Sequence, residues 1–307
     1  MIPAYDELPR NERLGLPHAW GVLPADRGSL AFIEPDHRTA AAALVQRGES
    51  LSLNLPLDLL DPPLFGRDKL VHRIVEVGRN TYEDVLDGFN PQAGSQWDGL
   101  GHVRARDQGF FGGATDLEAS ADELGIQVWA ATGIVGRGVL LDVERWARAV
   151  GRALDPMSGQ EITADDLRAC ADHEGVRLGQ GDIVCVRTGW VTAYRGLDDA
   201  GRKDPALGSA WAGLRADEAT ARLVWDTRLG AVCADNPALE CAPGDPAVGS
   251  LHRRLIPMLG TAVAELLDLD TLAGRCAALG RWTFLFVAAP LPLPGGVSSP
   301  SNAVAVL

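Results

Sequence analysis

The chain has 307 residues, of which 46% are hydrophobic and 22% are charged, so its composition is that of a globular protein with a substantial core. Asp and Glu outnumber Lys and Arg by 41 to 28, and the resulting formal charge of -13 argues against a nucleic-acid partner. The amino terminus carries acids and prolines where a signal sequence would be basic and apolar, and the longest apolar run, 282–290, is too short to cross a bilayer. We therefore expect a cytoplasmic protein that binds neither nucleic acid nor membrane.

Predicted strands and helices are interspersed along the chain. Residues 1–47 are expected to form an amino-terminal arm with a helix near 40–46, followed by strands at 50–60 and 70–77 and an irregular polar loop at 80–101. Further strands are predicted at 133–142, 181–190, 230–235 and 282–289, and helices at 143–154, 164–174, 216–228 and 251–259. This mixture favours an α/β or α+β domain over an all-β barrel.

A dense run of polar residues, QAGSQWDGLGH, occupies positions 92–102. Gln96 and Asp98 are two residues apart, so in an extended segment their side chains point the same way, and His102 closes the run. A carboxylate and an imidazole from one loop can hold a borderline metal such as Zn²⁺ or Mn²⁺. The structural alternative is that Asp98 caps a turn and His102 is a hydrogen-bonded core residue.

The same segment resembles the signature of the cyclase family, which includes kynurenine formamidases and isatin hydrolases and has the motif HxGTHxDxPxH. Asp98 and His102 match the aspartate and last histidine of the motif, whereas Gln92 and Gln96 stand in place of its first two histidines. The blocks GRGVLLDV, GDIVCVRTGW, GAVCADNPALE and LPLPGGVSSPSNAVAV are similar to family blocks in the same order. The chain is therefore identified as a member of this family from about residue 48 to residue 307, with residues 1–47 outside the match.

The resemblance implies a single mixed α/β domain with a central β structure and flanking helices, over residues 48–307, that commonly assembles as a homodimer or homotetramer. It also implies a His and a Glu some twelve residues apart that complete the metal centre and move protons. His252 and Glu265 fit this pair, although on their own they resemble a helix-face residue and a surface acid. The implied activity is the metal-dependent hydrolysis of a C–N bond in a small-molecule amide, lactam or formamide.

The two glutamines alter the metal centre that the resemblance implies. A neutral amide oxygen is a weaker ligand than an imidazole nitrogen, so the primary metal position should be empty or weak. We expect one divalent ion, Zn²⁺ or Mn²⁺, at the second position of the family, which uses Asp98, His102 and Glu265 as ligands. His252, Glu265 and His102 are the predicted catalytic residues.

The remaining predicted site residues would contact the small-molecule substrate, and they are Gln92, Gln96, Trp97, Trp190 and Asn236. Two other functions stay open. In a metal-free cyclase, dehydratase or isomerase, carboxylates and imidazoles would act as acid and base while the glutamine amides donate to a substrate carbonyl. In a non-catalytic relative, the same fold would bind a small molecule or partner without turnover.

Overall fold

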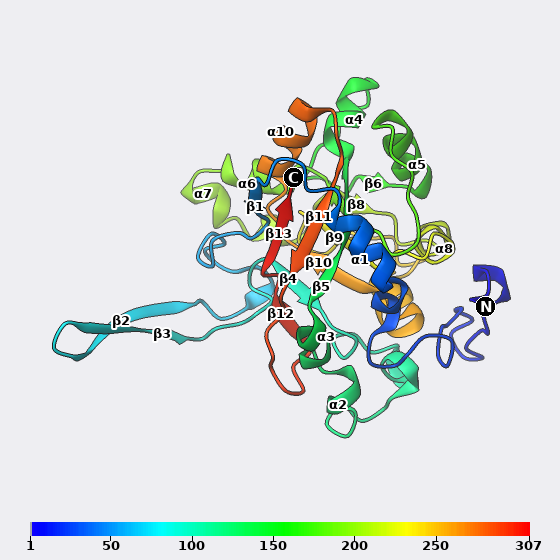
Figure 1. The fold of residues 1–307 in the computed structure, drawn as a ribbon, viewed down its shortest axis with the longest axis horizontal. Helices are drawn as coiled ribbons and strands as arrows, with labels where there is room; N and C mark the ends of the chain where they lie inside the picture. Colours follow the sequence, from blue (N-terminus) through cyan, green and yellow to red (C-terminus); the bar gives the residue numbers. More distant parts are fainter. Residues whose placement is uncertain (1) are drawn as a thin grey trace.

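A nine-stranded sheet forms the centre of the computed structural model, which describes residues 2–307 (Figure 1). The four middle strands run parallel to one another, and the strands on either side are antiparallel to them. In spatial order the strands are β1 (Ser50–Ser52), β13 (Ala303–Val306), β11 (Thr283–Ala288), β5 (Ile134–Asp142), β7 (Ile183–Arg187), β9 (Ala231–Ala234), β10 (Ala262–Glu265), β4 (Gln96–Asp98) and β12 (Ser298–Pro300).

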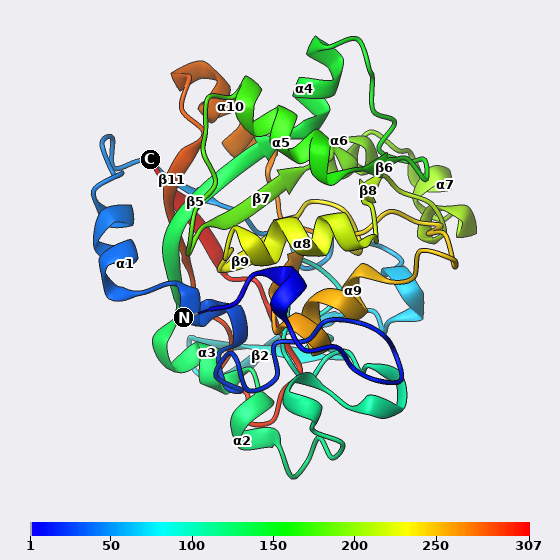
Figure 2. The ribbon, with the colours of Figure 1, turned by 90° about the vertical axis from the view of Figure 1, so that its right-hand side faces the viewer.

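Helices flank this curved sheet, and α5 and α8 lie on the side of it that faces the viewer in Figure 2. The α-helices are α1 (Pro35–Ala42), α2 (Ala121–Leu124), α3 (Gln127–Thr132), α4 (Val143–Ala149), α5 (Ala164–His173), α6 (Trp190–Arg195), α7 (Asp199–Arg202), α8 (Glu218–Asp226), α9 (Leu251–Arg253) and α10 (Asp270–Leu279). The architecture confirms the predicted mixed α/β domain with a central β structure and flanking helices. Within residues 2–307, no helix is long and apolar enough to span a membrane.

Shorter elements connect these parts. The tight 3₁₀ turns are η1 (Tyr5–Glu7), η2 (Gly28–Phe32), η3 (Leu64–Gly66), η4 (Arg106–Gln108), η5 (Phe111–Gly113) and η6 (Pro205–Gly208). The wider π-helical segment η7 (Arg254–Leu259) continues α9. Two small sheets complete the fold: β2 (Val71–Gly78) pairs with β3 (Thr81–Asp87), and β6 (Glu161–Ile162) pairs with β8 (Gly213–Leu214). The β2–β3 hairpin projects away from the body as a long arm (Figure 1).

The middle strands are buried on both faces, which explains their nearly continuous apolar sequences. Their free thiols, Cys185 and Cys233, are fully buried and serve as small apolar core groups. A second apolar cluster lies apart from the main core and contains Trp190, Tyr194 and Trp211.

Most predicted elements are present with shorter bounds, and the clearest agreement is the helix start at Thr163, whose hydroxyl accepts the N–H of Asp166 at 3.1 Å. The predicted helix at 40–46 lies earlier, as α1, because Pro35 suits the first helical turn. The predicted strand at 50–60 ends at Ser52. The predicted irregular loop at 80–101 is wrong in part, since it contains β3 and β4, and β10 was not predicted.

The amino-terminal arm packs on the body of its own chain. Tyr5 and Leu8 belong to the main hydrophobic core. The Tyr5 backbone N–H donates to Asp226 Oδ1 at 2.8 Å, and the Trp225 indole N–H donates to the carbonyl of Pro3 at 3.0 Å. The predicted arm and the predicted domain at 48–307 therefore share one core.

Candidate functional site

Two neighbouring strands position the acidic groups of the site. Strand β4 pairs with β10 so that Gln96 lies opposite Glu265 and Asp98 lies opposite Val263. Directly opposed residues of an antiparallel pair point to the same face, and so do residues two apart on one strand. Gln96, Asp98 and Glu265 consequently share one face of the sheet, and all three are buried.

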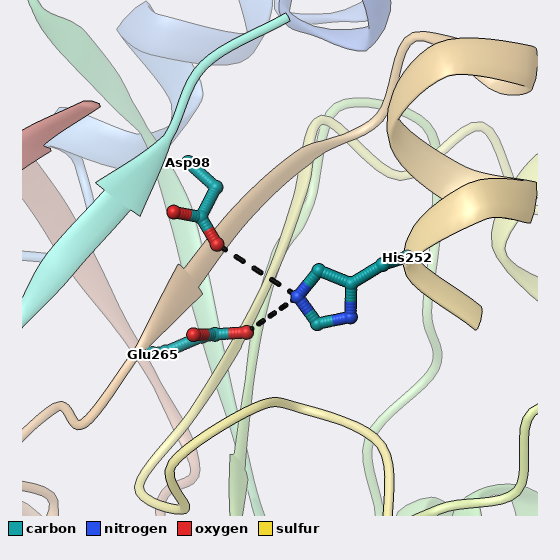
Figure 3. A group of neighbouring side chains, drawn as sticks. All are labelled: Asp98, His252 and Glu265. Atoms are coloured by element: carbon teal, nitrogen blue, oxygen red, sulfur yellow. Dashed lines mark ion pairs between the residues drawn. The ribbon is translucent and has the colours of Figure 1, made fainter. Parts of the chain in front are cut away.

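His252, on α9, faces these carboxylates (Figure 3). Its Nε2 lies 2.8 Å from Glu265 Oε1 and 3.8 Å from Asp98 Oδ2. One ligand atom from each residue lies within 4.8 Å of the other two, which brings the three together as a possible metal-binding group. This group includes His252, whereas the predicted ligand set contained His102 in its place.

Burial and charge oppose each other at these groups. Burial raises the pKa of Asp98, but hydrogen bonding to His252 and the nearby imidazoles outweigh it, so the pKa of Asp98 is lowered. Burial and the charge of Asp98 raise the pKa of Glu265 to about 7. Burial lowers the pKa of His252, yet the charge of Glu265 and hydrogen bonds to carboxylates hold it well above its usual value. The arrangement therefore stabilises positive charge between two buried carboxylates.

Glu240 orients His252, and its role was not predicted from the sequence. Glu240 Oε2 accepts the His252 backbone N–H at 2.7 Å and lies 2.9 Å from His252 Nδ1. Ser250, the residue that caps α9, donates its hydroxyl to Glu240 Oε1 at 3.1 Å. An acceptor at Nδ1 directs Nε2 of the imidazole towards Asp98 and Glu265. The only sequence signal for Glu240 was its place at the end of the GAVCADNPALE block.

The two glutamines hold one oxygen of each carboxylate. The Gln92 amide N–H donates to Asp98 Oδ1 at 2.9 Å, and the Gln96 amide N–H donates to Glu265 Oε2 at 2.8 Å. The opposite oxygens, Asp98 Oδ2 and Glu265 Oε1, face His252 Nε2 and have no other polar partner within residues 2–307, where Gln96 Oε1 has none at all. The glutamines thus orient the carboxylates, and their predicted contact with substrate stays a prediction.

His102 lies on the other side of Asp98. Its Nε2 is 3.7 Å from Asp98 Oδ1, and the Gln92 amide nitrogen lies 3.1 Å from its Nδ1. Asp98 therefore has one imidazole near each oxygen, with His102 near Oδ1 and His252 near Oδ2. Burial lowers the pKa of His102, so this ring is neutral at pH 7 and can accept a proton.

The position of the Trp97 side chain argues against its predicted contact with substrate. It alternates with Gln96 and Asp98 along β4, so its side chain lies on the opposite face of the sheet. The ring is fully buried, packs edge-on against Trp129 and Phe286, and donates its indole N–H to the Ser301 carbonyl at 2.9 Å. Trp97 anchors β4 in the core.

Trp190 and Asn236 are also fully buried, outside the group of Asp98, His252 and Glu265. The ring of Trp190 stacks on Tyr194 with centroids 5.2 Å apart, and its indole N–H has no partner within the described chain. The Asn236 amide N–H donates to the carbonyls of Ala212 and Leu239, which gives this side chain a structural role. Their predicted contacts with substrate stay predictions.

The donor set fits one divalent cation. Two buried carboxylate oxygens and one imidazole nitrogen converge, and the amide oxygen of Gln96 has no hydrogen-bond partner within residues 2–307. Two carboxylates buried this close together repel each other, so positive charge between them stabilises the group. Carboxylates and a histidine nitrogen are ligands that Zn²⁺ and Mn²⁺ accept.

Comparisons with known proteins place the chain in a family. A family model described as "putative cyclase" matches residues 51–241. A crystal structure of a novel cyclase is 31% identical, with a TM-score of 0.82 over 94% of this chain and 99% of that chain. No curated protein matches the chain.

More distant structures share the fold. Isatin hydrolase A from Labrenzia aggregata, bound to benzyl benzoate, is 19% identical, with a TM-score of 0.57 over 86% of this chain and 94% of that chain. A predicted metal-dependent hydrolase from Bacillus stearothermophilus is 17% identical, with a TM-score of 0.50 over 84% of this chain and 97% of that chain. The family match over 51–241 and the similarity at 31% identity show that this chain belongs to the cyclase family.

Proposed function

We propose that the protein is a metal-dependent hydrolase of a C–N bond in a small-molecule amide, lactam or formamide. The observation that carries the proposal is the convergence of two buried carboxylate oxygens, Asp98 Oδ2 and Glu265 Oε1, with the imidazole nitrogen Nε2 of His252. Asp98, Glu265 and His252 would hold one Zn²⁺ or Mn²⁺. Such an ion, when bound, lowers the pKa of water to about 7 and polarises a carbonyl.

The chain itself supplies orientation and proton transfer. Glu240 fixes the His252 ring, while Gln92 and Gln96 fix the two carboxylates. His102 is neutral and retains 27% of its side-chain exposure, so it is our candidate for taking a proton from the attacking water and passing it to the leaving nitrogen. This assignment makes His102 the proton carrier and His252 a ligand.

A metal-free cyclase, dehydratase or isomerase would use the glutamine amides as donors to a substrate carbonyl. Gln92 and Gln96 already donate to Asp98 and Glu265, so the geometry favours the hydrolase.

Metal binding tests the proposal directly. Isothermal titration with Zn²⁺ and with Mn²⁺ should give about one ion per chain for the wild type, and Asp98→Asn should lose binding. Asp182→Asn is a matched control, because Asp182 is equally buried but pairs with Arg137. The His102→Gln variant should keep the metal and lose hydrolysis of formanilide and simple lactams. Metal binding that survives in Asp98→Asn would contradict the proposed centre.

We also propose that the protein assembles as a homodimer or homotetramer. The β2–β3 hairpin supports this assembly, since Ile74 and Tyr82 are 68% and 64% exposed on one face of it. Isolated two-stranded hairpins are marginal in water, so a second copy covering this face would stabilise it. Sedimentation should show a dimer or larger species for the wild type and a smaller species for Ile74→Lys with Tyr82→Lys. A monomeric wild type would contradict the assembly.

A further inference from the structure

Arg67 lies at the edge of the proposed metal centre, just after η3. Its Nη1 donates to the backbone carbonyl of Gln92, the residue whose side chain holds Asp98. Burial lowers the pKa of Arg67, and the charges of Glu265 and Asp98 oppose that shift. The guanidinium is therefore within electrostatic reach of both site carboxylates.

Most donors of this guanidinium are free for a ligand. Arg67 forms no ion pair within residues 2–307, and the hydrogen bond to Gln92 uses one of its five N–H groups. Arg187, whose side chain is 12% exposed, shows the contrast, because it pairs with Asp142, Glu144 and Asp270. A partly buried guanidinium without an anion beside a functional site is a ready carboxylate receptor, since its planar fork matches that group.

Phe65 places an apolar surface next to Arg67. The guanidinium lies over the Phe65 ring at 5.0 Å from its centroid, and the ring meets Trp211 edge-on at 5.8 Å. Phe65 is 48% exposed and has a φ of 63°, a left-handed conformation that a bulky side chain rarely adopts. Such backbone strain concentrates where a loop presents a side chain to a ligand.

The unpaired charge of Arg67 favours an anionic ligand. The nearby carboxylates are engaged elsewhere, since Asp98 and Glu265 face His252 Nε2 and Glu240 faces His252 Nδ1. None of them forms an ion pair with Arg67 within residues 2–307. We propose that Arg67 binds a carboxylate carried by the substrate and that Phe65 contacts the apolar part beside it. The substrate class is then an amide, lactam or formamide that bears its own carboxylate. This inference rests on the proposed function for the nature of the bond that reacts.

A binding experiment separates this inference from the hydrolase proposal. The probes are 2-carbamoylbenzoate, which carries an amide and a carboxylate on one ring, and benzamide, which lacks the carboxylate. Their dissociation constants are measured by titration calorimetry for the wild type, Arg67→Gln and Arg67→Lys, in Zn²⁺ and in chelator. Arg145→Gln is the matched control, since Arg145 lies over the Trp282 ring at 5.8 Å on α4, outside the site.

The wild type should bind 2-carbamoylbenzoate at least about tenfold more tightly than benzamide in Zn²⁺, which is the size of one charge-assisted hydrogen bond. Arg67→Gln should lose this preference, Arg67→Lys should keep part of it, and Arg145→Gln should keep all of it. Phe65→Ala should weaken both ligands alike. Equal binding of the two probes by the wild type, no binding of either, or a preference retained in Arg67→Gln would overturn the inference.

Turnover and metal affinity are not part of this readout. Absence of Zn²⁺ binding would refute the proposed function without deciding the carboxylate preference, which is then read in chelator. Benzoate, titrated in the same way, represents the carboxylate of a released product. If Arg67 binds only such a product, the affinity for benzoate will depend on Arg67 and the wild type will show no preference between the two amides, which would overturn the inference.

Discussion

The Glu240→Gln substitution tests the proposed role of His252 as a metal ligand. Glu240 accepts both the backbone N–H of His252 and, at 2.9 Å, the N–H of its Nδ1. Gln is nearly isosteric and retains one acceptor oxygen, so the fold should survive. It removes the negative charge that keeps Nδ1 protonated and makes Nε2 a stronger electron donor.

The expected loss of Zn²⁺ affinity follows from this geometry. Removing a carboxylate that orients a ligand histidine typically weakens metal binding by about 10- to 100-fold, or about 1.4–2.8 kcal/mol. We expect the upper part of this range, because one carboxylate oxygen of Glu240 holds both the ring and the backbone of His252, whose side chain is 15% exposed. Because this side chain is little exposed, water cannot readily replace the hydrogen bonds that Glu240 makes to His252.

Competition with a chromophoric chelator measures the Zn²⁺ affinity of the wild type and Glu240→Gln at pH 7. Glu144→Gln serves as the control, since Glu144 is a similarly buried carboxylate that pairs with Arg187. Thermal unfolding of the metal-free proteins shows whether the fold is intact. If Glu240→Gln keeps the wild-type affinity within about twofold while Asp98→Asn loses it, the role assigned to Glu240 is refuted.

Three further predictions concern the core and its pH dependence. Burial raises the pKa of Glu174 from 4.5 to about 8, so the folded protein keeps this proton up to about pH 8 while the unfolded chain loses it near 4.5. The free energy of unfolding of the wild type should therefore fall as pH rises from 4.5 through 8, and Glu174→Gln should gain a few kcal/mol on wild type between pH 5 and 9. Parallel urea midpoints of the two proteins would contradict this prediction. A methyl group at Gly138 would lie 2.2 Å from the Phe284 ring, so Gly138→Ala should lower the free energy of unfolding in denaturant by about 1–3 kcal/mol. An unchanged denaturation midpoint would contradict this and show that the strands move apart to admit the methyl group. Trp97→Phe removes the donor to the Ser301 carbonyl and should lower the free energy of unfolding by about 1–3 kcal/mol without changing the Zn²⁺ affinity. A loss of Zn²⁺ affinity without a loss of stability would show that Trp97 belongs to the functional site.

Local sequence rules identified those parts of the fold that depend on neighbours along the chain. The runs before Asp142 and Asp235 are apolar because strands covered on both faces must be so, and β5 and β9 lie there. The turn from Thr163 to Asp166 closes its own hydrogen bonds and therefore marks the start of α5 in the sequence itself.

Strand β10 shows where such rules fail. Its four residues, AVAE, are too few to display a period, and its neighbours β9 and β4 come from distant parts of the chain. Glu265 looks like a surface acid in sequence, yet it is buried, because pairing with β4 places it opposite Gln96. Arg67 carried no local signal, and Glu240 had only its place in a family-like block, since each acts through residues that the fold brings to it.

Motif order in the sequence identifies the family, and the two-residue period of extended backbone predicts that Gln96 and Asp98 lie on one side of a strand. The same period places Trp97 on the other side, although we predicted that this residue contacts substrate. Which imidazole meets both carboxylates depends on tertiary packing, which brings His252 Nε2 within 2.8 Å of Glu265 and 3.8 Å of Asp98. Gln96 and Glu265 are 169 residues apart, and the pairing of β4 with β10 and the docking of α9 set which charges meet. Long-range packing of this kind leaves no periodic trace in a single sequence.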